Sequence, residues 1–207
     1  LSTELQQLRM IGEGASSRCF GYLVGDREYA VRFGRYIEDF QKDRWAARFS
    51  SALLPIPEVF EVGEALDGYF AISRRAHGIP FENVAPEVWQ GVIPDLVNLL
   101  EALRTADLKE TAGVGHLDKD VTLNCATWRE HLLTVVEDEP TQRTHGWRRK
   151  LEQNSPSGRD VFERGLDEFK NLALANVPRS LLHCDLMNSN TLVDEGRINA
   201  VFDWGCG

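Results

Sequence analysis

The end of the chain carries the pattern that most constrains its fold. Two apolar runs, 191–194 and 197–203, flank the Glu-Gly dipeptide at 195–196, and a two-residue turn between two such runs predicts a β-hairpin. Pairing across this turn places Asn190 opposite Val201, at the open end of the hairpin. The loop before the hairpin and the last residues of the chain are therefore expected to lie close together.

Three oxygen-bearing side chains gather at this open end. Asn190 and Asp203 lie near the ends of the two strands, and Asp185 is five residues before Asn190. Phosphoryl transfer from ATP needs a group that accepts or orients the proton of the acceptor hydroxyl, and hard oxygen ligands for magnesium. One Asp with an Asn–Asp pair supplies both. The pattern H-x-D-x-x-x-x-N, followed by a hairpin and a second Asp, predicts a kinase catalytic loop. In this loop, His183 would have an orienting role rather than a chemical one.

Two alternatives for this segment stay open. In the first, Asp185, Asn188 and Asn190 only cap local backbone groups of a turn, and Asp203 is a helix N-cap. Capping accounts for each residue singly but not for their convergence. In the second, Cys184 is a nucleophile activated by His183. Adjacent residues of an extended chain point to opposite sides, which makes that activation awkward.

The rest of the chain is a β-rich first third followed by a helical remainder, which predicts an α+β fold. Thr127 followed by Glu130 is typical of a capping box at a helix start. Pro94 predicts a kink or a restart within its helix. The expected strands lie at 8–11, 19–24, 28–33, 59–62 and 69–73, and the expected helices at 36–51, 88–106, 128–136 and 160–175.

The glycine turn at 12–14 indicates a nucleotide site only together with the residues that follow it. A kinase needs a strand–turn–strand whose backbone N–H groups cover the phosphates, a basic residue on the next strand and an acidic partner on a helix. Taken alone, the basic residue would be an exposed arginine on an edge strand. The candidates are Ser16 and Ser17 after the turn, Arg32 on the strand, and Asp39 or Asp43 on the helix.

Composition excludes several classes of protein. The net charge of -9 argues against a nucleic-acid partner and favours a cationic one. The four cysteines form no C-x-x-C pair, so neither a zinc site nor a disulfide framework is indicated, and they fit a reducing cytosol. No apolar run approaches the length of a membrane span. We therefore expect a cytoplasmic protein that does not associate with membranes.

Four stretches carry a resemblance to a known family: EGASSRCF at 13–20, YAVRF at 29–33, LPIPEV at 54–59 and ISRRAHG at 72–78. With the residues at 183–204, they make the sequence similar to the aminoglycoside phosphotransferases, most closely the hygromycin B phosphotransferases. The resemblance implies a protein-kinase-like, two-lobed fold. Its nucleotide-binding lobe would span 1–76 and its catalytic lobe 77–207, the latter incomplete because family members continue further.

The resemblance also implies roles for individual residues. Asp185 looks like the catalytic base, and Asn190 and Asp203 look like the magnesium ligands. Arg32 looks like the phosphate-pairing residue, where most kinases have lysine, and Asp43 like its acidic partner. In addition, the backbone at Arg74 and Ala76 would contact adenine, Ser16 and Ser17 would cover the phosphates, and Cys184 stands where the wider family has glycine.

The expected activity is ATP- and magnesium-dependent phosphorylation of a hydroxyl on an aminoglycoside or aminocyclitol antibiotic, which would confer resistance. The acidic composition suits such a polycationic acceptor. Two alternatives remain open: a kinase for an endogenous small molecule such as choline, homoserine or a sugar, and an inactive nucleotide-binding module.

Overall fold

The computed structural model describes residues 5–14, 17–117, 120, 122–140, 142–172, 177–186 and 188–206. The chain forms two compact units. The first comprises Leu1–Ala112, His116–Thr122 and Ser180–Gly207, and the second comprises Gly113–Gly115 and Leu123–Arg179. The segment at 183–204 therefore belongs to the same unit as the N-terminal strands.

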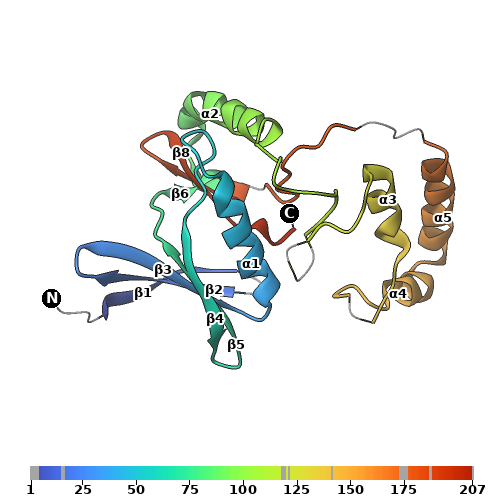
Figure 1. Cartoon of the computed structure of the whole chain (residues 1–207), viewed down its shortest axis with the longest axis horizontal. Coiled ribbons are helices and arrows are strands. Elements are labelled where there is room, and N and C mark those ends of the chain that lie inside the picture. Colours follow the sequence, from blue (N-terminus) through green and yellow to red (C-terminus); the bar gives the residue numbers. More distant parts are fainter. Residues whose placement is uncertain are drawn as a thin grey trace. The chain divides into compact units, whose positions relative to one another are not determined.

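The first unit is built on a five-stranded antiparallel sheet (Figure 1). The expected strands are confirmed, and most extend beyond their predicted ends. Ala30, Val31 and Ala71 form the buried centre of the sheet, on the paired strands β3 (Arg27–Gly34) and β5 (Gly68–Arg74). In the order β1-β2-β3-β5-β4, the strands span Leu5–Glu13, Ser17–Val24, Arg27–Gly34, Gly68–Arg74 and Val59–Ala65.

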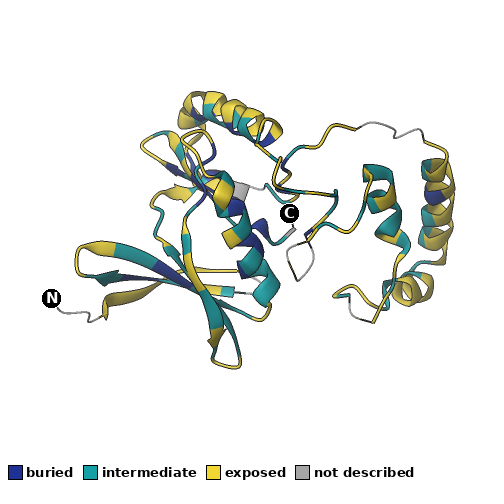
Figure 2. Cartoon of the chain, in the orientation of Figure 1, coloured by how far each residue is buried: buried dark blue, intermediate teal, exposed yellow. Residues whose placement is uncertain are grey.

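Helix α1 (Ile37–Ala46) packs against strands β4 and β5 and against the turn at 204–206. It passes into a 3₁₀ turn, Ala47–Phe49, which ends the helix before the Pro55 segment. Buried apolar side chains join the helix to the end of the chain, and Figure 2 shows this buried layer in dark blue. The cluster contains Ala46, Leu54, Ile56, Leu99, Leu103, Leu181, Val201 and Trp204.

Helix α2 (Pro86–Arg104) runs without interruption through Pro94, so it does not restart there, and the alternative of a kink stays a prediction. Proline removes one N–H and frees the carbonyl four residues earlier, at Gln90. Both residues are exposed, so water can satisfy that carbonyl. The opposite face of α2 buries Val92 and Leu99.

The predicted hairpin is confirmed as β7 (Thr191–Asp194) and β8 (Arg197–Val201), with the short β6 (Ile79–Pro80) beside β7. The predicted register holds next to the turn but is wrong at the open end, where Thr191, not Asn190, lies opposite Val201. The cause is a bulge at Asn199. Its Nδ2 donates to the His77 carbonyl oxygen at 2.9 Å, a tertiary contact that the turn alone does not reveal.

The second unit is helical. The capping box is confirmed: Thr127 Oγ1 accepts from the Glu130 N–H at the start of α3 (Trp128–Leu133). Helix α5 (Pro156–Lys170) begins four residues before its predicted start, because Ser155 caps it and proline is well suited to its first turn. Its inner face buries Leu166. Helix α4 (Trp147–Asn154) was not predicted.

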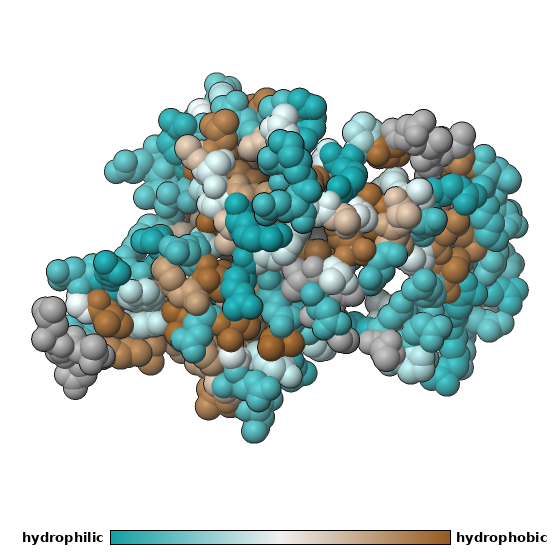
Figure 3. Space-filling model, in the orientation of Figure 1, coloured by the Kyte–Doolittle hydropathy of each residue, from teal (hydrophilic) through white to brown (hydrophobic). Residues whose placement is uncertain are grey.

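The surface is of mixed polarity. On the face drawn in Figure 3, hydrophobic patches are interspersed with hydrophilic side chains. Within the ranges that the structure describes, no helix is both long and apolar enough to cross a membrane.

Candidate active site

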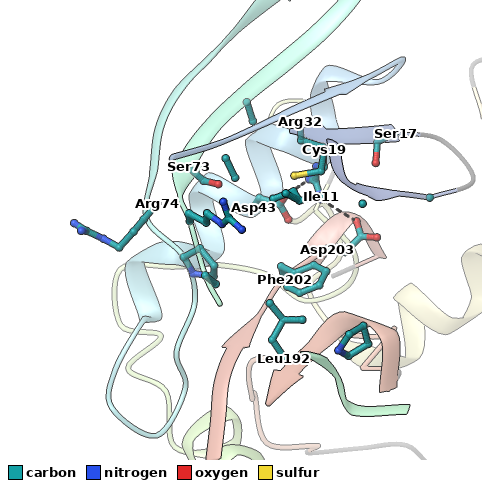
Figure 4. A pocket seen from close by; sticks show the side chains of 18 of the residues that line it. Ile11, Ser17, Cys19, Arg32, Asp43, Ser73, Arg74, Leu192, Phe202 and Asp203 are labelled. Carbon is teal, nitrogen blue, oxygen red and sulfur yellow. Dashed lines mark hydrogen bonds and ion pairs between the residues drawn. The ribbon is translucent and has the colours of Figure 1, made fainter. Parts of the chain in front are cut away.

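A cavity of about 550 Å³ lies in the first unit, between the sheet and the β7–β8 hairpin. In Figure 4, Ile11 and Cys19 line one side, and Leu192 and Phe202 lie across from them. This volume is within the range of small-molecule sites. The cavity thus offers an apolar slot with charged side chains near it.

Arg32 and Asp43 form a buried ion pair beside this cavity, with 16% and 12% of their side chains exposed. Asp43 Oδ2 accepts from Arg32 Nη2, and Asp43 Oδ1 accepts from the Trp204 N–H at 2.8 Å. Burial raises the pKa of Asp43, although Arg32 and the Trp204 N–H act to lower it. Burial works to lower the pKa of Arg32, but the carboxylates of Asp43 and Asp203 outweigh it and raise that pKa.

Asp203 lies on the other side of the same arginine. Its Oδ1 is 3.7 Å from Arg32 Nη1, and half of its side chain is exposed. Its φ of 68° is in the left-handed region. The turn after it is held by α1, because Lys42 Nζ donates to the Gly205 carbonyl oxygen at 2.7 Å. Two neighbouring residues of α1, Lys42 and Asp43, therefore fix the backbone beside Asp203.

Asn190 and Asp185 are joined by the Asn190 amide. Its Nδ2 donates to the Asp185 carbonyl oxygen at 2.9 Å and to Asp185 Oδ2 at 3.3 Å. The Asn190 carbonyl oxygen accepts from the Phe202 N–H, which brings Asn190 next to Asp203. The predicted convergence of these three residues is thus present. Asn190 also has the capping role of the alternative, and its Oδ1 has no hydrogen-bond partner among the residues that the structure describes.

His183 is buried, and its Nε2 donates to the Phe202 carbonyl oxygen at 3.1 Å. Burial lowers the pKa of His183, which keeps the ring neutral at neutral pH. Cys184 is exposed and has a φ of 61°, a conformation that glycine adopts freely. One side chain is thus buried and committed to a backbone carbonyl while the other faces solvent, an arrangement unlike an activated Cys–His pair.

The other predicted residues line the cavity or lie beyond the described ranges. Ser17 lines the cavity, and its carbonyl oxygen accepts from the Gly14 N–H at 2.9 Å, which closes the turn. Ser16 lies outside the described residues. Arg74 and Ala76 also line the cavity, but the Arg74 N–H is taken by the Glu58 carbonyl oxygen.

Several cavity residues were missed from the sequence, namely Ile11, Cys19, Arg75, Leu192 and Phe202. Pairing across the turn at 25–26 was a usable signal for Cys19, because it places Cys19 directly opposite Arg32. No local pattern distinguished Arg75 from its exposed neighbour Arg74.

Comparison with known proteins assigns the chain to a family. The profile of the phosphotransferase enzyme family matches residues 7–207. Hygromycin-B 4-O-kinase of Escherichia coli is 31% identical over 204 residues, which cover 97% of this chain and 58% of that protein. This chain therefore spans little more than half the length of that curated relative.

Solved structures agree with this assignment. A thermostable mutant of aminoglycoside phosphotransferase APH(4)-Ia, in a ternary complex with AMP-PNP and hygromycin B, superposes with a TM-score of 0.82 at 29% identity, over 98% of this chain and 68% of that one. A streptomycin–ATP complex of APH(2")-IIa shares the fold at 18% identity with a TM-score of 0.54, over 97% of this chain and 67% of that one. The expected α+β, protein-kinase-like fold is confirmed, and the chain belongs to the phosphotransferase enzyme family.

Proposed function

We propose that this chain carries the ATP site and the catalytic residues of a small-molecule kinase that phosphorylates a hydroxyl of a hygromycin-like aminoglycoside and thereby confers resistance. One observation carries the proposal. Arg32 links the buried Asp43 to the half-exposed Asp203, and the Asn190–Phe202 backbone hydrogen bond brings the Asp185–Asn190 pair next to that carboxylate. Phosphoryl transfer needs these groups in one place.

The donor set fits magnesium. Asn190 Nδ2 is committed to Asp185, which leaves Oδ1 to act as a ligand, and the Asp203 carboxylate is half exposed. Both are the hard oxygen donors that Mg²⁺ prefers. No cluster of three or more His, Cys, Asp or Glu occurs among the described residues, so phosphate oxygens and water would complete the coordination. Bound magnesium would neutralise the charge that develops on the phosphates.

The remaining residues divide the chemistry. Asp185 would accept the proton of the acceptor hydroxyl from the position that the Asn190 amide gives it. Arg32 would pair with the nucleotide phosphates, and Asp43 would hold it in place. Ser16 and Ser17 would cover the phosphates, and the backbone at Arg74 and Ala76 would bind adenine between the two lobes, 1–76 and 77–207.

The acceptor class rests on the relatives and on charge. The relative that is 31% identical is a hygromycin B kinase, and the APH(4)-Ia complex holds hygromycin B with a nucleotide analogue. A net charge of -9 favours a cationic acceptor.

The experiment measures ATP turnover by the full-length protein with magnesium, with and without hygromycin B. We expect stimulation by the antibiotic, and a loss of turnover of about 10²- to 10⁴-fold in Asp185→Asn. Asp194→Asn, the same change at an exposed turn position, should leave turnover unchanged. Turnover with choline, homoserine or a sugar but not with hygromycin B would overturn the acceptor class. Absence of any turnover would overturn the kinase assignment.

A further inference from the structure

Arg75 is a buried cation with little compensation inside the chain. Only 13% of its side chain is exposed, and its Nε is buried without a hydrogen-bond partner in the described part of the structure. Its ion pair is long, with Nη1 3.9 Å from Glu28 Oε1, and Glu28 also pairs with His77. Burial of a guanidinium without close partners is costly. This cost suggests that a ligand completes its contacts.

The guanidinium occupies space that a glycine leaves empty. A Cβ added to Gly21 would lie 2.7 Å from Arg75 Nη1 and 3.2 Å from Arg75 Cζ. The same atom would lie 3.2 Å from Ile11 Cγ2, and Ile11 lines the cavity. Any side chain at position 21 would therefore compete with Arg75 for its place beside Ile11.

The register of β2 shows where Arg75 lies along the cavity relative to Arg32. Cys19 lies opposite Arg32, whereas Gly21 lies opposite Ala30. Two residues along a strand correspond to roughly 7 Å. Arg75 is thus displaced along β2 from Arg32, the residue proposed to pair with the phosphates, and it is adjacent in sequence to Ala76, the residue proposed to contact adenine.

Apolar side chains line two facing sides of the cavity. Ile11 and Cys19 on the sheet side face Leu192 and Phe202 on the hairpin side (Figure 4). A guanidinium is planar and stacks on aromatic rings, and the resulting cation–π attraction grows as water is excluded.

We propose that Arg75 lays its guanidinium against the face of the nucleotide base and is a specificity-determining residue for purine nucleotides. The proposal rests on the nucleotide binding proposed above. A ring-face contact does not distinguish adenine from guanine. Loss of Arg75 should therefore weaken the binding of ATP and of GTP to the same extent, and it should lower the preference for both nucleotides over CTP.

The test is calorimetric titration of the full-length protein with ATP, GTP, CTP, adenosine and tripolyphosphate. In Arg75→Ala, the Kd for ATP, GTP and adenosine should rise roughly 5- to 30-fold, the range of a desolvated cation–π contact. The affinity for tripolyphosphate should be unchanged. Arg27→Ala, the same change at an exposed position of β3, should alter no Kd by more than about twofold.

Two further variants separate the position of the guanidinium from its charge. Gly21→Ala should displace the guanidinium without removing its charge and should also weaken the binding of adenosine. Arg75→Lys keeps the charge but not the plane, so it should restore only part of the affinity.

The possible failures are distinguishable. If the wild-type protein binds ATP and Arg75→Ala binds it within twofold, the base contact is wrong and the proposed function stands. An equal loss for tripolyphosphate would show that Arg75 contacts the phosphates, which also overturns the proposal. If the wild-type protein binds no nucleotide, the proposed function itself fails.

Discussion

Arg32 contacts two carboxylates that lie in very different surroundings. The Asp43 side chain is 12% exposed, and both of its oxygens accept hydrogen bonds, one from Arg32 and one from the Trp204 N–H. The Asp203 side chain is 50% exposed, lies 3.7 Å from the arginine and belongs to a residue with a left-handed backbone angle. Both oxygens of the first carboxylate are hydrogen-bonded within the chain, whereas the second carboxylate has only the longer ion pair with Arg32 among the described residues.

This difference separates a structural end of the site from a reactive end. At the Asp43 end, the loss of either partner leaves an uncompensated buried charge. At the Asp203 end, the carboxylate is half exposed and belongs to a residue that lines the cavity. We therefore expect substitution of Asp203 to lower mainly activity and substitution of Asp43 to lower mainly stability.

The largest effect is expected on activity, from Asp203→Asn. Asparagine tolerates the left-handed conformation, and the side chain is half exposed, so the free energy of unfolding should change by less than about 0.5 kcal/mol. Loss of the charge should lower kcat about 10³-fold, the upper range for one preorganised electrostatic group. Magnesium-dependent phosphorylation and urea unfolding measure the two quantities. Retained activity with a large loss of stability would remove the distinction between the two aspartates.

The second effect is expected on stability, from Asp43→Ala. Removal of one partner of a buried ion pair typically costs about 3–5 kcal/mol, and here Arg32 would lose its closest carboxylate. The free energy of unfolding, measured with urea, should fall by about 3 kcal/mol.

Asp43→Asn is the matched control for this change. Its side-chain oxygen can still accept from the Trp204 N–H, so it should lose less stability than Asp43→Ala. If Asp43→Ala is as stable as the wild type, the pair is not the structural end of the site.

The sequence could predict features that depend on residues close together in the chain, but not features that depend on distant ones. The hairpin turn, the capping box at Thr127 and the convergence of Asp185, Asn190 and Asp203 depend on contacts between nearby residues, and all of them are present. The register at the open end of the hairpin was wrong because the bulge at Asn199 accompanies a bond to His77, 122 residues away. Local patterns do not encode such a contact.

Two other features lay outside local patterns. Helix α4 has 8 residues and only two apolar ones, Trp147 and Leu151, so its apolar periodicity is too short to predict a helix. The position of the Arg75 side chain depends on Gly21, a residue far earlier in the chain, whose missing side chain leaves space for the guanidinium. Tertiary burial, rather than residue type, distinguishes Arg75 from Arg74.

A smaller effect is expected when pH changes, through His183. Burial lowers the pKa of this ring below its ordinary value of about 6.5 in the folded protein. The unfolded state therefore takes up the proton first, and the stability that His183 contributes above about pH 6.5 is lost as the pH falls toward the folded pKa.

This prediction is measured by urea unfolding between about pH 5 and pH 8, a range chosen to bracket the ordinary histidine pKa of about 6.5. Wild-type stability should decline on the acid side more steeply than that of His183→Asn, which has no proton to gain. Parallel slopes in the two proteins would show that His183 is not the group responsible.

The smallest effect is expected at Cys184, which lies next to the buried His183 but has a left-handed φ of 61°. That conformation costs a non-glycine residue about 1–2 kcal/mol, whereas glycine adds about 0.5–1 kcal/mol of backbone entropy to the unfolded chain. Cys184→Gly should therefore stabilise the protein by about 0.5 kcal/mol, measured by urea unfolding. Cys184→Ala also removes the thiol but keeps Cβ, so the difference between the two variants isolates the backbone contribution. Equal stability of the two variants would show that the thiol, rather than the left-handed backbone, accounts for any change.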